Sequence, residues 1–405
     1  MKNLLIPILA CSVMAVASCK KDDDENLPET GPPVETNPPN TTYSPAFAGQ
    51  TRIGSITTET PYNVKALTTS LASPWGIVSL PDGRLLITEK AGRMRIVTTA
   101  GNVSAPITGL PQVNAGGQGG LLGLCLDPQF ESNRMVYYSF SEPVAGGTNT
   151  AVGKGRLAND EKTIEGATVI YRALPAYNGT LHYGGRVVFD KNGNLFVSTG
   201  ERSDLATRPL AQDVSSGLGK IVHITKEGQP ASDNLFRAQN GARPELYSIG
   251  HRNPQGIAIH PQTGDLWESE HGPRGGDEIN RIRAGVNYGW PIITYGLEYS
   301  GQPVGAGIQQ KDGLEQPVYY WDPVVSPSGM TFYSSDRIGE WKNNLFIGSL
   351  SAKHIVRLVI RDNKVVGEER LLATEQQRFR DITQGTDGAL YAITDEGRLY
   401  QIDKK

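Results

Sequence analysis

The stretch that decides the fold is Gly185-Arg186-Val187-Val188-Phe189-Asp190-Lys191-Asn192-Gly193-Asn194-Leu195-Phe196-Val197. Two short runs of apolar residues flank an Asn-Gly pair. Such a pair between apolar runs is a strong signal for a tight β-hairpin turn, because both residues adopt backbone angles that other residues avoid. The segment therefore predicts two antiparallel strands joined by a short turn.

The same pattern recurs along the chain. A small residue precedes or enters an apolar run, a turn with Gly, Pro or Asp follows, and a second apolar run completes the unit. The six copies begin at residues 75, 121, 185, 256, 329 and 381. Their spacing of roughly 50–70 residues leaves room for further strands and predicts radial repetition, an all-β six-bladed β-propeller. A large β-sandwich is the rival fold, but a sandwich does not require six similar units.

The ends of the chain and its composition agree with this fold. Residues 51–71 precede the first full copy, and we expect them to add a strand to the last blade, which closes the ring and leaves no exposed edge. Among 405 residues there are 47 Gly and 26 Pro, and only 20% are charged, which suits short strands joined by turns. The net charge of −3 offers no basic face for nucleic acid or for a membrane surface.

The first nineteen residues predict an export signal. Lys2 is followed by a short apolar core and then by Val16-Ala17-Ser18-Cys19, which resembles a bacterial lipobox with Cys19 as the lipidation site. An ordinary signal peptide with a chance cysteine is the alternative. Residues 20–44 are polar and predict a flexible linker, and residues 45–405 the propeller. We therefore expect a lipid-anchored protein in the periplasm or on the outer membrane of a Gram-negative bacterium.

The cysteines leave no disulfide framework in the mature chain. Cys11 would leave with the signal and Cys19 would carry lipid, so only Cys125 remains. Cys125 lies in an apolar run, which predicts a small core residue and not a catalytic thiol.

Two loops of the fourth copy carry unusual polar residues. In His251-Arg252-Asn253-Pro254, Arg252 is a forked donor suited to carboxylate or carbonyl oxygens, although a structural turn explains the loop equally well. The loop 268–280 combines four carboxylates with Gly272 and Pro273. Oxygen ligands on a tight turn suit a hard cation such as calcium, but the spacing is not that of an EF-hand.

With these loops in place, the sequence resembles the PQQ-dependent soluble glucose and aldose sugar dehydrogenases, over nearly all of residues 65–402. The resemblance rests on motifs in the same order and at similar spacing: 117–123 (GQGGLLG), 182–186 (HYGGR), 251–256 (HRNPQG), Gly272-Pro273 with 277–280 (DEIN), 287–291 (NYGWP) and 378–381 (RFRD). That family is a six-bladed propeller, which agrees with the repeats.

The resemblance implies a set of site residues. His182 matches the catalytic base, and Gln118 matches a glutamine beside substrate and base. The positions that match contacts of the cofactor PQQ are Gln118, Arg252, Asn253, Tyr299, Arg378 and Arg380. Gly272 and Pro273 match carbonyls that hold the catalytic calcium, and Glu278 and Tyr288 match carbonyls that hold a second, structural calcium. His251 and His271 are expected to be scaffold residues or to support the residues that contact the cofactor, and Asp277 and Glu278 could also be simply solvated.

The implied activity is oxidation of an aldose at C1 to the lactone. Calcium and Arg252 would polarise the quinone, His182 would take the hydroxyl proton, and a hydride would pass to PQQ. The electron acceptor would be a quinone, a cytochrome or a dye. The alternative function is a non-catalytic calcium-binding propeller that binds carbohydrate or protein. Two positions depart from the glucose enzymes: Leu181 replaces an acidic residue before the base, and Ser351 aligns with a lysine, with Lys353 displaced by two.

Overall fold

The computed structural model describes residues 28–405. The predicted signal peptide, Cys19 and the start of the predicted linker lie outside the described residues. Within the described part, short antiparallel strands dominate. No helix found there is both long and apolar enough to cross a membrane.

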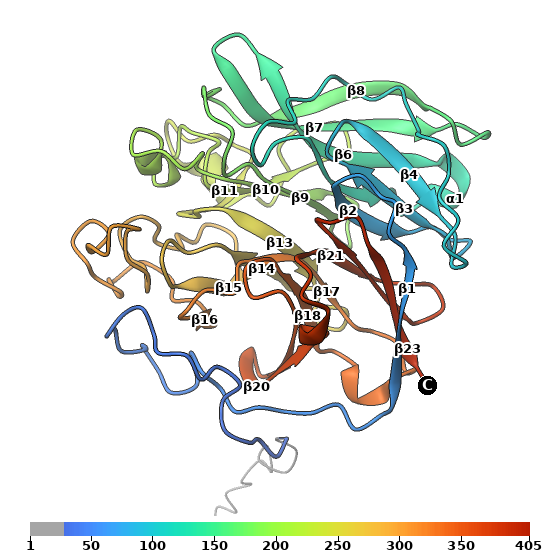
Figure 1. Ribbon diagram of the computed structural model, residues 1–405. Helices are drawn as coiled ribbons and strands as arrows, with labels where there is room; N and C mark the ends of the chain where they lie inside the picture. Colours follow the sequence, from blue (N-terminus) through green and yellow to red (C-terminus); the bar gives the residue numbers. More distant parts are fainter. Residues whose placement is uncertain (1–27) are drawn as a thin grey trace, which may run out of the picture.

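The strands form six sheets that follow one another around a common centre (Figure 1). Five sheets have four strands and one has three. The first blade holds β2 (Pro74–Ser79), β3 (Leu85–Glu89) and β4 (Arg93–Val97). The second holds β5 (Leu121–Leu126), β6 (Met135–Val144), β7 (Gly147–Leu157) and β8 (Ile164–Arg172). The third holds β9 (Gly184–Phe189), β10 (Leu195–Thr199), β11 (Lys220–Ile224) and β12 (Leu246–Ile249).

The other three blades complete the circle. The fourth holds β13 (Pro254–Ile259), β14 (Leu266–Glu270), β15 (Asp277–Ile282) and β16 (Tyr319–Trp321). The fifth holds β17 (Pro327–Phe332), β18 (Leu345–Ser349), β19 (Ile355–Arg361) and β20 (Lys364–Leu371). The sixth holds β21 (Phe379–Gln384), β22 (Leu390–Thr394), β23 (Leu399–Lys404) and β1 (Tyr62–Thr68). The only helical pieces among the described residues are α1 (Phe130–Asn133) and 3-10 turns at Arg208–Ala211, Leu235–Ala238, Gly339–Trp341 and Ala373–Glu375.

The prediction of a six-bladed propeller is confirmed. Each of the six predicted hairpins forms the first two strands of one blade. The first strand of each blade contacts the first strands of the two neighbouring blades, so these six strands enclose the axis. Gly193, in the turn between β9 and β10, has a φ of 80°, which glycine adopts without strain.

The ring closes as expected, because β1 pairs antiparallel with β23 from the C-terminus. The outer strand of the sixth blade thus comes from the start of the folded chain. This pairing joins the two ends of the propeller and removes a free edge.

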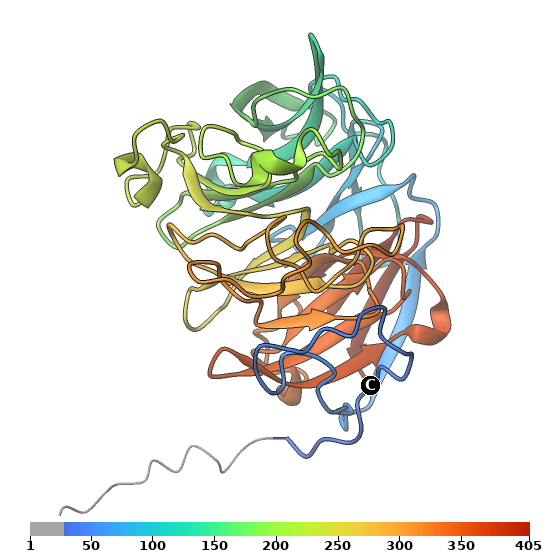
Figure 2. The ribbon, with the colours of Figure 1, turned by 90° about the vertical axis from the view of Figure 1, so that its left-hand side faces the viewer.

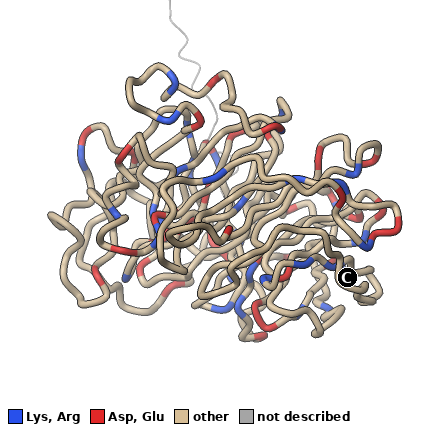
Figure 3. The backbone as a smooth tube through the Cα atoms, turned by 90° about the horizontal axis from the view of Figure 1, so that it is seen from above, with Lys and Arg blue, Asp and Glu red and all other residues tan. Residues whose placement is uncertain are grey.

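Apolar side chains pack between the blades, and the contacts of one blade with the next supply the core. Cys125 belongs to this packing, as predicted, and burial raises the pKa of its thiol. Residues of both charge signs are spread around the backbone in Figure 3, in keeping with the small net charge.

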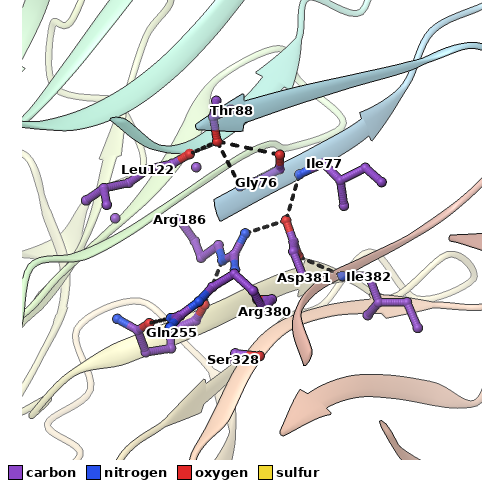
Figure 4. A network of polar contacts seen from close by, with 12 residues as sticks. Gly76, Ile77, Thr88, Leu122, Arg186, Gln255, Ser328, Arg380, Asp381 and Ile382 are labelled. Carbon is purple, nitrogen blue, oxygen red and sulfur yellow. Dashed lines mark hydrogen bonds and ion pairs between the residues drawn. The ribbon is translucent and has the colours of Figure 1, made fainter. Parts of the chain in front are cut away.

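The axial channel is crossed by a buried ion pair (Figure 4). Arg186 on β9 donates to Asp381 on β21 over 2.5 Å, and these strands belong to opposite blades of the ring. Arg186 also donates to the Gln255 carbonyl oxygen, and its guanidinium lies 4.0 Å from the ring centre of Trp75. The channel is therefore filled by side chains beneath the end that carries the site.

Residues 35–41, part of the segment predicted to be a flexible linker, lie against the propeller (Figure 2). Glu35 pairs with Arg370 over 2.8 Å, and the backbone amides of Asn40 and Thr41 each donate to the Asp322 carboxylate over 2.9 Å. This part of the segment is therefore bound, because charged and polar groups of the outer strands give it partners.

Candidate active site

Most of the predicted site residues gather at one end of the propeller. They lie where the first strand of a blade begins or where the second strand ends. His182 precedes β9, Arg252 and Asn253 precede β13, and Gly272 follows β14. Because successive blades repeat the same path, these positions meet around the axis although they are far apart in sequence.

A cavity of about 490 Å³ opens at this end. This volume lies in the range of about 300–1,000 Å³ that is usual for small-molecule sites. The residues that line it come from every blade except the third: Ser73, Trp75, Lys90, Gly117, Gln118, Gln255, His271, Ser326, Leu350, Arg378, Arg380 and Asp395.

His182 adjoins this cavity through Gln118. The backbone amide of His182 donates to Gln118 Oε1 over 2.8 Å, and Nδ1 of the ring lies 2.6 Å from Glu201 Oε1. Among the described residues, Nε2 has no hydrogen-bond partner, and it is not one of the fully buried polar atoms. The contact assigns the Nδ1–H tautomer, which leaves Nε2 as a free acceptor that solvent can reach.

The histidine is held in an unusual backbone conformation. His182 has a φ of 44°, in a region that non-glycine residues rarely adopt and that is common at functional sites. Gly200 makes this possible, because a Cβ there would lie 2.2 Å from the His182 carbonyl oxygen. The second strand of the blade therefore fixes both the His182 backbone and, one residue later, its partner Glu201.

The electrostatics keep the His182 imidazole unprotonated near pH 7. Burial lowers the pKa of His182 well below its usual value, and Arg252, Arg202 and Arg208 add to the effect. Burial also raises the pKa of Glu201 to about 7. A neutral imidazole near pH 7 is what a general base requires.

Arg252 and Asn253 are positioned by one carboxylate. Glu270 Oε2 accepts from the backbone amides of both residues, over 2.5 and 3.2 Å. The Arg252 guanidinium donates to the carbonyl oxygens of His271 and Gly272, over 3.0 and 2.8 Å. Arg252 Nε and Asn253 Nδ2 remain buried without a partner in the described part of the chain, which is rare and marks a place for an acceptor.

Asp277 stabilises the loop of Gly272 and Pro273. Its carboxylate accepts from the amides of Gly272 and Ser326, over 2.8 and 2.6 Å, and burial raises its pKa to about 7. The expectation that Asp277 could be simply solvated was wrong, because these amides need a buried acceptor. The Gly272 carbonyl takes one bond from Arg252 and keeps a second lone pair for another ligand.

Carboxylates also crowd beneath this loop. One ligand atom from each of His251, Glu268 and Glu270 lies within 4.8 Å of the other two, and all three side chains are buried. Burial and repulsion from Glu270 raise the pKa values of Glu268 and Glu278 well above normal. Glu278 is thus not simply solvated either. With Tyr288, Glu270 and Gly272 it borders a smaller cavity, which suits a cation.

Arg378 and Arg380 share a single acid. Both donate to Asp395, over 2.9 Å from Arg378 Nε and 2.7 Å from Arg380 Nε. All three residues line the main cavity, but neither Ser351 nor Lys353 does. The displaced lysine noted in the sequence therefore does not take part in this cavity wall.

Some placements differ from the expectations. Tyr299 lies 74% exposed and borders neither cavity. His271, expected to be a scaffold or supporting residue, lines the main cavity itself, and burial lowers its pKa to about 3. Sequence reasoning missed Glu201 and Lys90. A signal for Glu201 was present, because His182–Glu201 and His251–Glu270 share the same separation of 19 residues in consecutive repeats.

Comparisons with known proteins identify the family of this chain. A sequence model of the glucose/sorbosone dehydrogenase family matches residues 71–401. The chain belongs to this family. The resemblance inferred from the six motifs is thereby confirmed.

Individual relatives are similar over most of their length. The aldose sugar dehydrogenase of Escherichia coli is 42% identical over 85% of this chain and 93% of its own. A crystal structure of a glucose dehydrogenase superimposes with a TM-score of 0.81 at 44% identity, covering 85% and 99% of the two chains. The PQQ-bound aldose sugar dehydrogenase of Streptomyces coelicolor has a TM-score of 0.69 at 28% identity, covering 86% and 99%.

Proposed function

We propose that this protein is a quinoprotein that oxidises aldose sugars at C1 to lactones, with PQQ and calcium as cofactors. The observation that carries the proposal is the neutral base His182, oriented by Glu201, beside a cavity with more basic than acidic side chains. Relatives named aldose sugar dehydrogenase and glucose dehydrogenase, one of them with PQQ bound, support the same activity.

The residues of the cavity fit PQQ, a planar quinone with three carboxylates. Lys90, Arg378 and Arg380 line the cavity, and only the carboxylate of Asp395 offsets them there. The unpartnered donors Arg252 Nε and Asn253 Nδ2 suit the oxygens of such a ligand. When bound, PQQ would supply the two-electron acceptor that no side chain can provide.

The protein's own part in the reaction follows from the pair of His182 and Glu201. His182 Nε2 takes the proton from the C1 hydroxyl of the sugar, and Glu201 stabilises the imidazolium that forms at Nδ1–H. Gln118 holds the base in position through the His182 amide and lines the cavity. Arg252 supplies positive charge where electron density collects.

Calcium would bind at two places. The carbonyls of Gly272 and Pro273 would hold the catalytic ion next to Arg252. The carbonyls of Glu278 and Tyr288 would hold a structural ion, and the crowded carboxylates of Glu268, Glu270 and Glu278 would offset its charge. Export, lipidation at Cys19 and the identity of the electron acceptor stay predictions from the sequence.

The test is reconstitution. The protein is purified without metal, PQQ and calcium are added, and dye reduction is followed with a panel of aldoses. Sugar-dependent dye reduction with a change in quinone absorbance is expected. Calcium binding without any PQQ binding or dye reduction would reject the enzyme and favour the non-catalytic propeller.

A further inference from the structure

Lys90 occupies a position in the first blade that other blades use for site residues. It directly follows β3, as Asp395 follows β22 and Leu350 follows β18. Its backbone is clamped on both sides, since its amide donates to the Ser73 carbonyl and its carbonyl accepts from the Leu121 amide, each over 3.1 Å. The start of its side chain is therefore fixed at the rim of the cavity.

The charge of Lys90 has no acidic partner. Its Nζ donates to the Gly117 carbonyl over 2.7 Å, and no carboxylate in the described part of the chain lies within ion-pair distance of it. An ammonium group has three donors, so two remain for a ligand. Asp395, the only acid among the described residues that line the cavity, is already shared by Arg378 and Arg380.

The surroundings of Lys90 favour an anion. Burial lowers its pKa, and repulsion from Arg380 lowers it further, against a smaller opposite effect of Asp395. Three cations therefore face one carboxylate in the same cavity. A bound polyanion would relieve this imbalance, because opposite charges attract strongly at a partly buried site.

The position of Lys90 also complements the two arginines. Arg378 and Arg380 belong to the sixth blade, which contacts the fifth blade on one side and the first on the other. On the side of the fifth blade, the cavity wall contributes Ser326 and Leu350, which carry no charge. His271 also lines the wall, but its pKa, lowered to about 3, leaves it uncharged near pH 7. The first blade therefore offers the only further cationic group among the described residues of this wall.

We propose that Lys90 is a cofactor-binding residue, which donates from the first blade to a carboxylate of PQQ next to those bound by Arg378 and Arg380. The inference rests on the proposed function. Lys90 also holds the Gly117 carbonyl, next to Gln118, so it links the cofactor to the loop that positions His182.

The test measures PQQ binding to the metal-free protein after addition of calcium, by titration of the change in quinone absorbance, without any sugar. Lys90→Met keeps a long apolar stem and removes the charge. We expect its Kd for PQQ to rise about 10–100-fold, as for loss of a hydrogen bond to a charged group. Lys90→Arg should remain within about threefold of the wild type.

Salt dependence separates the charge from a merely structural role. The affinity of the wild type for PQQ should fall with ionic strength more steeply than that of Lys90→Met. The variant lacks the ion pair of Lys90, so salt screens one ion pair fewer in it. Lys162→Met is the matched control: its side chain is 76% exposed, so its affinity and salt dependence should equal those of the wild type. Thermal melting of each variant confirms that it is folded.

Two outcomes would overturn the inference. The first is that Lys90→Met binds PQQ within twofold of the wild type. The second is that it binds weakly but with unchanged salt dependence, which would assign Lys90 to support of the Gly117 loop. Failure of the wild type itself to bind PQQ would reject the proposed function, and this result is distinct from either.

Discussion

His182 and His251 occupy matching places in the third and fourth blades, yet their environments differ. Each precedes the first strand of its blade, and each ring contacts a glutamate 19 residues later, through Nδ1, over 2.6 and 3.2 Å. The second ring nitrogen separates them. Within residues 28–405, Nε2 of His182 has no hydrogen-bond partner, whereas Nε2 of His251 lies 2.8 Å from Ser248 Oγ and its ring stacks on Tyr288.

The comparison teaches that the His–Glu pair is a repeated element of the propeller and not by itself a catalytic signature. The other carboxylate oxygen of Glu270 accepts hydrogen bonds from the amides of Arg252 and Asn253. The pair of His251 and Glu270 in the fourth blade therefore holds the loop that carries these two residues. The third-blade pair leaves one imidazole nitrogen available. Only a free nitrogen can accept a proton from a substrate.

The largest expected effect is that of His182→Ala. Loss of the free Nε2 should lower kcat by about 10²–10⁴-fold, the usual contribution of a general base. The affinity for PQQ, measured by absorbance titration, should stay within a few-fold, because His182 does not line the main cavity. Turnover within a few-fold of the wild type would show that His182 is not the base.

A smaller effect is expected for Glu201→Gln. The amide oxygen can still accept from Nδ1–H, but it cannot stabilise the imidazolium by charge, so kcat should fall by about 10–100-fold. Glu270→Gln is the counterpart in the fourth blade. Because Glu270 binds two backbone amides of the cofactor loop, its loss should appear in PQQ affinity and melting temperature. The same pattern in both variants would contradict the division of roles.

The pH profile of kcat/KM should sharpen the assignment. Glu201, with a pKa raised to about 7, takes a proton as the pH falls through 7, which weakens the base and lowers the rate in part. His182, with a pKa held well below its usual value, takes a proton only at lower pH, where the rate is lost. The partial step should disappear in Glu201→Gln. A step that persists in this variant would point to another group.

The smallest effect on catalysis is expected for His251→Ala. Its ring is fully buried and bonded at both nitrogens, so its removal should cost about 2–4 kcal/mol of stability. The melting temperature, measured by circular dichroism, should fall by several degrees. The rate per PQQ-loaded molecule should change less than a few-fold. A loss as large as that of His182→Ala would place His251 in the chemistry.

The repeats predicted the fold well because a hairpin is local. Asn192-Gly193 between two apolar runs needs no distant partner to form its turn, and the same holds for the other five copies. Lys90, in contrast, follows an ordinary strand in the sequence. Its value as a site residue depends on Arg378 and Arg380, which lie almost 300 positions later and reach the same cavity only through ring closure.

By itself, the sequence determined the six repeats, the closing strand, the family and the identity of most candidate site residues, since each of these is written in short patterns of neighbouring residues. Only the tertiary structure decided what orients His182 in the absence of an acid at Leu181, where Lys90 lies, and that Tyr299 and Lys353 stand outside the cavity. These are contacts between blades and between strands. Their geometry depends on how the ring closes, and no local pattern specifies it.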